Sequence, residues 1–127
     1  GKPFQDGDPA IYAKNGMRVR SKSEAIIIDL LLEYEIPFKY ECPLYLKGMG
    51  EVYPDFRVLN KRTGEEFVWE HFGKVDEFKY ANDTVRKLET YHFNGFFEGR
   101  NLLCTWESSK CPFGPRDAKR IIETYLV

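Results

Sequence analysis

Three acidic residues occupy positions where a folded chain rarely places an unpaired carboxylate. Glu70 lies in the middle of the apolar run Phe67-Val68-Trp69-Glu70-His71-Phe72-Gly73, Asp55 follows Tyr53-Pro54 in another strand-like run, and Glu24 begins an Ile- and Leu-rich segment. A buried carboxylate is costly unless it is paired or bound to a cation. Hard cations such as Mg²⁺ and Mn²⁺ prefer carboxylate oxygens as ligands. These residues therefore indicate a candidate divalent-metal site.

Asp55 and Glu70 are expected to lie next to each other. The patterns over residues 51–59 and 66–72 predict two strands, and Asn60-Lys61-Arg62-Thr63-Gly64 predicts the hairpin loop that joins them. Alternation puts Glu70 on the same face as Val68 and Phe72. Two neighbouring carboxylates repel, and a bound cation removes that repulsion. The pair is therefore a stronger indication of a metal site than either acid alone.

Glu24 has a second explanation. In Ser21-Lys22-Ser23-Glu24, the serine can cap a helix and the glutamate can complete a capping box. Helical spacing also places Glu24 on the apolar face that carries Ile27, Ile28 and Leu31, at the end of that face. Capping and metal binding both remain open for this residue.

The remaining pattern predicts an α/β fold with a mixed central β-sheet flanked by helices. Residues 1–20 are expected to be a basic N-terminal arm with a short strand over 17–20, and residues 21–127 a single domain. A helix follows Ser21 and stops before Pro37, and strands are expected over 38–42, 44–46 and 101–106. Helices are predicted over 76–93, with Phe78, Ala81, Val85, Leu88 and His92 on the inner stripe, and from Pro115 to about Tyr125.

In this order and spacing, the acids resemble the PD-(D/E)XK nuclease superfamily. Pro54-Asp55 is similar to its PD motif, Glu70 to the acid of the next strand, and Glu24 to a glutamate that many members supply from their first helix. The resemblance implies a restriction-endonuclease-like core and hydrolysis of phosphodiester bonds, in DNA more than RNA, with Mg²⁺ or Mn²⁺ activating water. It also implies that the metal ligands are Asp55, Glu70, Glu24 and the backbone carbonyl of His71.

One departure from the family motif concerns its lysine. Phe72 stands two residues after Glu70, where members carry a lysine that orients water or stabilises charge. Glu70-His71-Phe72-Gly73 resembles a variant branch found with some DNA-helicase proteins, which makes Lys87 the candidate replacement. Lys87 could also be an ordinary solvated helix lysine, and Lys74 is a second candidate. A literal E-x-K, Glu77-Phe78-Lys79, falls in a predicted helix although the motif requires a strand.

Candidate contacts to nucleic acid come from basic and aromatic residues near these motifs. Arg and Lys side chains often contact phosphates, and bases stack on aromatic rings. The alternative is that each of them is a solvated surface residue. The set comprises Arg18, Arg20, Lys22, Arg57, Lys74, Tyr80 and Tyr91.

The composition limits the other possibilities. The net charge of −1 shows no overall basic character, so nucleic-acid contacts would have to be local. The three cysteines lack close pairing, and no signal-peptide or membrane-spanning pattern occurs, so a reduced, cytoplasmic protein is expected. A metal-dependent nuclease is the main hypothesis, with a homodimer or a helicase as candidate partner. The alternatives are a degenerate nuclease fold that only binds nucleic acid or protein, and an unrelated small interaction domain.

Overall fold

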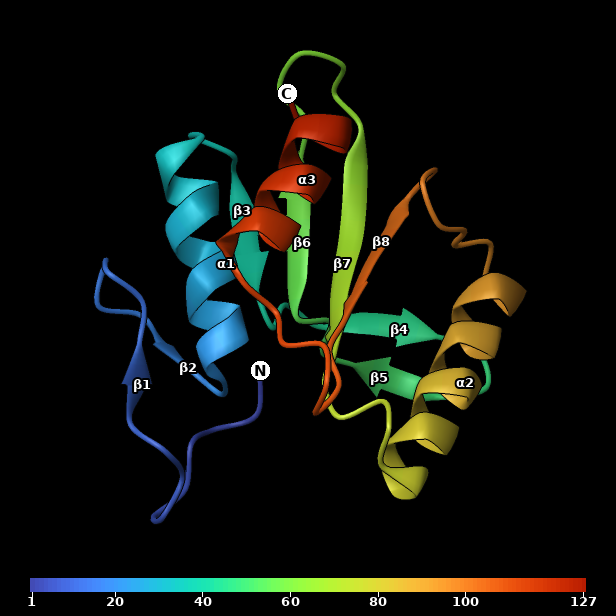
Figure 1. The fold of residues 1–127 in the computed structure, drawn as a ribbon. Helices are drawn as coiled ribbons and strands as arrows, with labels where there is room; N and C mark the ends of the chain where they lie inside the picture. Colours follow the sequence, from blue (N-terminus) through green and yellow to red (C-terminus); the bar gives the residue numbers. More distant parts are fainter.

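The computed structural model describes residues 1–127 and contains one four-stranded sheet, two short hairpins and three helices (Figure 1). The elements are β1 (Ile11–Tyr12), β2 (Arg18–Val19), α1 (Lys22–Glu33), β3 (Phe38–Tyr40), β4 (Leu44–Leu46), β5 (Gly50–Val52), β6 (Phe56–Leu59), β7 (Glu66–Phe72), α2 (Phe78–Phe93), β8 (Leu102–Trp106) and α3 (Pro115–Tyr125). None of the three helices has the length and hydropathy needed to cross a membrane.

The central sheet has the strand order β3-β6-β7-β8. The β3–β6 and β6–β7 pairs are antiparallel, whereas β7 and β8 are parallel. Parallel neighbours need a crossover connection, and α2 provides it between β7 and β8. The mixed α/β class expected from the sequence is therefore confirmed.

One face of the sheet is covered by α1 and α3 (Figure 1). Ile27, Ile28 and Leu31 of α1 are fully buried in a core that includes Phe56 of β6 and Trp69 of β7. This is the apolar stripe that the helical spacing predicts, and its burial holds α1 against the sheet. The position of Glu24 at the start of this stripe is therefore fixed by packing further along the helix.

The other face is covered by α2 and the β4–β5 hairpin (Figure 1). Its smaller core joins Leu46 of β4 to Val68 and Phe72 of β7, with Tyr91 of α2 buried against them. The inner stripe predicted for α2 is wrong in part, because Phe78 is 86% exposed and Val85 is also largely exposed.

Two other predictions differ from the structure. The strand expected over 51–59 is interrupted at Tyr53-Pro54-Asp55, because proline cannot donate to a strand ladder. The N-terminal arm expected over 1–20 includes the β1–β2 hairpin, and Ala13 and Val19 belong to the α1-side core. The second half of that arm is therefore part of the packed domain.

Candidate functional site

Asp55 and Glu70 lie next to each other at one end of the central sheet. Phe56 pairs with Trp69, so the next positions in the antiparallel register bring these two acids together. The backbone N–H of Asp55 donates to Glu70 Oε1 at 2.9 Å, and the N–H of His71 donates to Asp55 Oδ2 at 2.7 Å. Reciprocal backbone contacts thus hold both carboxylates in fixed orientations.

Glu70 also receives two side chains from α2. The hydroxyl of Tyr91 donates to Glu70 Oε2 at 2.9 Å, and Lys87 Nζ forms an ion pair with the same oxygen. Both donors lie on the inner face of α2, four residues apart, which is one helical turn. Glu70 itself is only 1% exposed, so these contacts account for the burial of a charged group inside a strand.

Glu24 reaches the site from the opposite face of the sheet. Ser21 Oγ accepts the backbone N–H of Glu24 at 3.2 Å, which confirms the helix cap. The carboxylate of Glu24 does not return to Ser21. It accepts the N–H of Arg20 at 3.0 Å and the hydroxyl of Tyr40 at 2.6 Å. Capping therefore explains the serine but does not explain where the glutamate side chain points.

The electrostatics of the site favour a cation. Burial, together with the charges of Glu70 and Glu24, raises the pKa of Asp55 well above its usual range. Burial also raises the pKa of Glu24, and the nearby Glu41 adds to the effect. Within the chain only the Lys87 ammonium is ion-paired with one of the three acids. The carboxylate charge at this end of the sheet is therefore only partly compensated.

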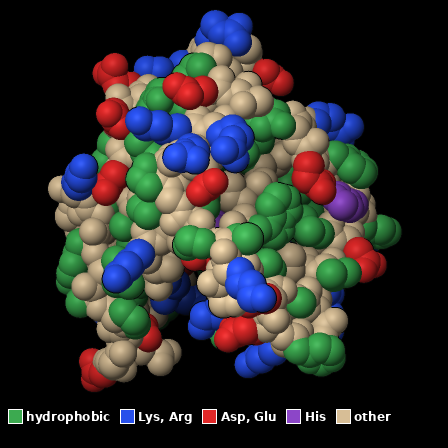
Figure 2. All heavy atoms as spheres, viewed as in Figure 1, with side chains coloured by type: hydrophobic (Ala, Val, Ile, Leu, Met, Phe, Trp, Pro, Cys, Tyr) green, Lys and Arg blue, Asp and Glu red, His purple; other side chains and the backbone are tan.

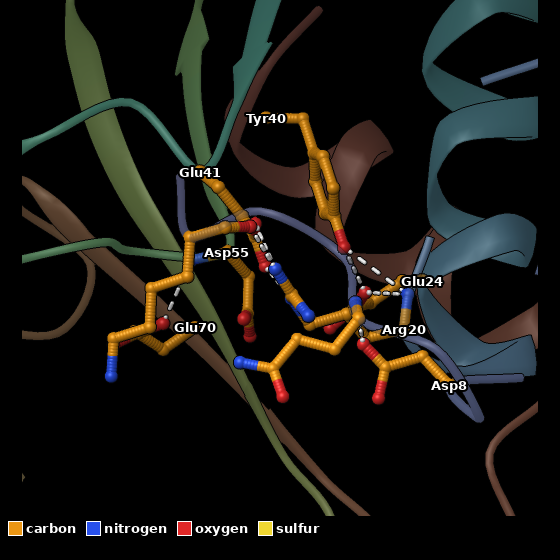
Figure 3. A network of polar contacts seen from close by, with 9 residues as sticks. Asp8, Arg20, Glu24, Tyr40, Glu41, Asp55 and Glu70 are labelled. Carbon is orange, nitrogen blue, oxygen red and sulfur yellow. Dashed lines mark hydrogen bonds and ion pairs between the residues drawn. The ribbon is translucent and has the colours of Figure 1, made fainter. Parts of the chain in front are cut away.

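Arg20 links the acids to a further carboxylate. In Figure 3 its side chain extends between Glu24 and the pair formed by Asp55 and Glu70. Its Nε donates to Glu41 Oε2 at 2.7 Å, and this contact raises the pKa of Arg20. Because Arg20 is already paired, it contributes less positive charge to a substrate than a free arginine would.

Two hollows reach the acids from the surface. One, of about 210 Å³, is lined by Asp55, Glu70, Thr84 and Lys87, and another, of about 590 Å³, includes Glu24 and the first turn of α1. His71, Gly73 and Tyr80 line both, so the two hollows adjoin. Figure 2 shows the molecule hollowed below the start of α1, with Lys and Arg side chains on the walls.

Comparison with known proteins gives one relative. Over 88 residues, the chain is 34% identical to the uncharacterized protein MJ1519 of Methanocaldococcus jannaschii. The aligned part is 68% of this chain, but it spans only 7% of that relative. No family model matches the chain, and no solved structure matches it. The case for function therefore depends on the geometry of the site.

Some of the residues predicted to contact nucleic acid line the hollows beside the acids, and others do not. Lys22, Lys74 and Tyr80 line the larger hollow, as does Arg20, and Lys74 Nζ lies 5.2 Å from the centre of the Tyr80 ring. Tyr91 was wrongly placed in this set, because it is fully buried and its hydroxyl is used by Glu70.

The two other arginines do not line these hollows. Arg18 donates to the carbonyl oxygens of Asp8 and Pro9 and covers the ring of Phe4. Arg57 lies in β6 opposite Val68. The alternative E-x-K is not supported, because Glu77 occupies the N-cap position of α2 and Lys79 lies in its first turn, not in a strand.

The donor set fits Mg²⁺ better than a metal that needs several protein ligands. No group of three or more His, Cys, Asp or Glu side chains is arranged to hold an ion. Mg²⁺ needs fewer, since it is usually bound by one or two carboxylates and keeps several waters. Asp55 Oδ1 and Glu24 Oε2 accept no hydrogen bond from the chain. Asp55 and Glu70, with the His71 carbonyl, are the residues that would hold the ion.

The sequence did not reveal every residue of the site. Tyr40 ends β3 and Glu41 follows it, with no motif around them, yet they contact Glu24 and Arg20. Glu107 follows β8 and contacts the His71 ring, which alternation had placed on the face away from Glu70. The only sequence signal for these residues is an acid directly after a strand, which is too common to be specific.

Proposed function

We propose that this chain is a metal-dependent nuclease domain that hydrolyses phosphodiester bonds in nucleic acid, in DNA more readily than in RNA. The observation that carries this proposal is the adjacent pair of Asp55 and Glu70, in which the buried Glu70 is ion-paired with Lys87. A carboxyl group whose pKa is raised, as that of Asp55 is, and which lies in a hollow close to a lysine, is typical of catalytic sites.

Asp55 and Glu70 would bind the ion, and the backbone contacts described above would keep both side chains oriented toward it. When bound, Mg²⁺ supplies a Lewis acid that activates the attacking water and offsets the charge of the phosphate. Glu24 faces the same end of the sheet and retains one free carboxylate oxygen. It would therefore contribute directly or through a water molecule.

Lys87 would take the role of the lysine that Phe72 replaces. Its ammonium group contacts Glu70 from α2, although it is 17 positions away in the sequence. A lysine held there can stabilise the charge that develops on the phosphate and can orient the attacking water. Its position supports an active enzyme over a fold that has lost catalysis.

The larger hollow provides a route for the substrate. Lys22 and Lys74 line it together with the first turn of α1, where backbone N–H groups favour anions. Tyr80 lines it as well and is 41% exposed, so its ring is available to stack on a base. Aspartate and glutamate side chains also line this hollow, so contacts to the substrate would be local.

Cleavage assays test this proposal. Linear, supercoiled and branched DNA, and RNA of matching sequence, are incubated with the protein and Mg²⁺ or Mn²⁺, with EDTA as the metal-free control. We expect metal-dependent cleavage of DNA that falls at least about 10²-fold in Glu70→Gln. Glu66→Gln is the matched control, because Glu66 is an exposed acid at the other end of the same strand.

Two results would count against the proposal. Wild-type protein that binds DNA but cleaves no substrate with either metal would favour a binding module. Cleavage that persists in Glu70→Gln at the wild-type rate would show that another site is responsible.

A further inference from the structure

A chain of hydrogen-bonded side chains lies behind the acids, on the face of β7 opposite Glu70. The His71 ring has Nδ1 2.8 Å from Thr105 Oγ1 and Nε2 2.7 Å from Glu107 Oε1. Its side chain is 4% exposed, and the ring centre lies 4.5 Å from that of Phe113. His71 and Glu107 also line the larger hollow, and the function proposed above gives their side chains no role.

The hydrogen-bond partners of the His71 ring suit a particular arrangement of donors and acceptors. The Glu107 carboxylate can only accept, so the proton lies on His71 Nε2. Thr105 Oγ1 accepts the indole N–H of Trp69 at 3.1 Å and lies 2.8 Å from His71 Nδ1, to which its own hydroxyl can donate. Both ring nitrogens of His71 have a hydrogen-bond partner, which favours one orientation of the ring.

This chain connects the elements that carry the three acids. Ser23 Oγ donates to Glu107 Oε1, and Ser23 precedes Glu24 in the first turn of α1. At the other end, the backbone of His71 follows Glu70 and donates its N–H to Asp55. The imidazole therefore couples the start of α1 to the end of β7, which lie on either side of the proposed metal.

We infer that His71 is a positioning residue for this site, acting with Glu107. The imidazole sets the distance of Glu24 from the pair formed by Asp55 and Glu70, and it orients the His71 backbone that holds Asp55. This inference rests on the proposed function, since it assumes that these acids bind a metal. Groups that orient metal ligands from behind commonly change metal affinity by about 10–100-fold when removed.

Mn²⁺ binding, measured by electron paramagnetic resonance on the folded protein, tests the inference without depending on cleavage. We expect His71→Ala and Glu107→Ala to weaken Mn²⁺ binding about 10–100-fold. Glu107→Gln keeps an oxygen that accepts from His71 Nε2, so its affinity should stay close to wild type. The Glu107 variants remain informative if His71→Ala fails to fold, because the Glu107 side chain is 30% exposed.

Asn60→Ala controls for a general loss of stability. Asn60 is buried and donates to the Tyr125 carbonyl at 3.0 Å, at the end of β6 away from Asp55. Its loss should lower the melting temperature and leave Mn²⁺ affinity unchanged. If Glu107→Ala keeps wild-type Mn²⁺ affinity, the inference fails but the proposed metal site stands. The same holds if Asn60→Ala weakens Mn²⁺ binding as much as Glu107→Ala does. No Mn²⁺ binding by the wild-type protein would overturn the proposed metal site as well.

Discussion

Each carboxylate of the site accepts a backbone N–H, and Glu24 and Glu70 each accept a tyrosine hydroxyl as well. A tyrosine hydroxyl from β3 binds Glu24, a backbone N–H binds Asp55, and Tyr91 with Lys87 binds Glu70. Neutral donors fix the direction of a carboxylate without cancelling its charge. The side chains are therefore oriented before any metal binds, while Asp55 and Glu24 still favour a cation.

Asp55 should make the folded protein less stable at neutral pH. Its pKa is raised in the folded state by burial and by Glu70, so stability should fall as pH rises from the ordinary value of 3.8 through the raised value. Asp55→Asn removes this titration. At pH values above the raised pKa of Asp55, the variant should therefore have a higher free energy of unfolding than the wild-type protein in metal-free buffer.

Denaturant unfolding at a series of pH values measures this difference. The advantage of Asp55→Asn should shrink as pH falls toward about 3.8, because below both pKa values the carboxyl is protonated in both states. Asp6→Asn, at an exposed aspartate, is the control and should show no such dependence. A variant that is less stable than wild type at neutral pH would contradict the repulsion described for Asp55.

Lys87 can be tested separately from the other lysines of the site. Lys87→Met should lower the single-turnover cleavage rate about 10²–10³-fold, as expected for loss of one charge-stabilising group. Lys74→Met should have a smaller effect, because the Lys74 ammonium lies over Tyr80. Lys61→Met, on an exposed lysine of the loop between β6 and β7, is the control. A larger loss in Lys74→Met than in Lys87→Met would assign the role to Lys74.

At the scale of elements, the helix cap before Glu24 has a measurable contribution. Ser21→Ala removes the acceptor for the Glu24 N–H, so it should cost about 1 kcal/mol of unfolding free energy. Ser21→Asp keeps a capping acceptor and should recover most of that loss. Chemical denaturation measures both variants, and equal stability of Ser21→Ala and wild type would show that the cap is not needed.

The elements that local sequence determines were predicted most accurately. β7 and α3 begin and end where alternation and Pro115 indicate, and α1 starts after its serine cap. The stripe of α2 was misjudged because part of its inner face is polar. Lys87 faces inward to Glu70, while the apolar Phe78 and Val85 face solvent. Hydrophobic periodicity cannot identify an inner face that carries polar side chains.

The contacts of the site that the sequence could not predict are long-range. The sequence predicted a hairpin between the strands of Asp55 and Glu70, so a local pattern was sufficient to predict that these two acids are neighbours. The contact of Tyr40 with Glu24 depends on how α1 crosses the sheet, and that of His71 with Glu107 depends on the register of a parallel strand pair. Neither arrangement has a local sequence signal.

In the molecule as a whole, the site lies at one end of the sheet, between its two packed faces. α1 brings Glu24 from one face, α2 brings Lys87 from the other, and the sheet itself carries Asp55 and Glu70 (Figures 1 and 3). Each face has its own hydrophobic core, with Trp69 on one and Tyr91 on the other. The two cores therefore fix the relative positions of groups that come from distant parts of the chain.

A divalent metal should stabilise the whole fold. An ion that binds only the folded state at 100 times its dissociation constant adds about 2.7 kcal/mol to the free energy of unfolding. We expect the melting temperature of the wild-type protein to rise with Mg²⁺, and that of Asp55→Asn to rise much less. NaCl at equal ionic strength is the control, and an equal rise in both proteins would point to metal binding elsewhere.

The central claim is that Asp55 and Glu70 share one divalent ion. Diffraction from crystals grown with Mn²⁺, recorded at a wavelength where manganese scatters anomalously, tests this claim most directly. We expect an anomalous peak in contact with carboxylate oxygens of both residues, with the Lys87 ammonium either displaced from Glu70 or sharing the Glu70 carboxylate with the ion. A well-ordered site with both carboxylates in place and no peak between them, at saturating Mn²⁺, would contradict it.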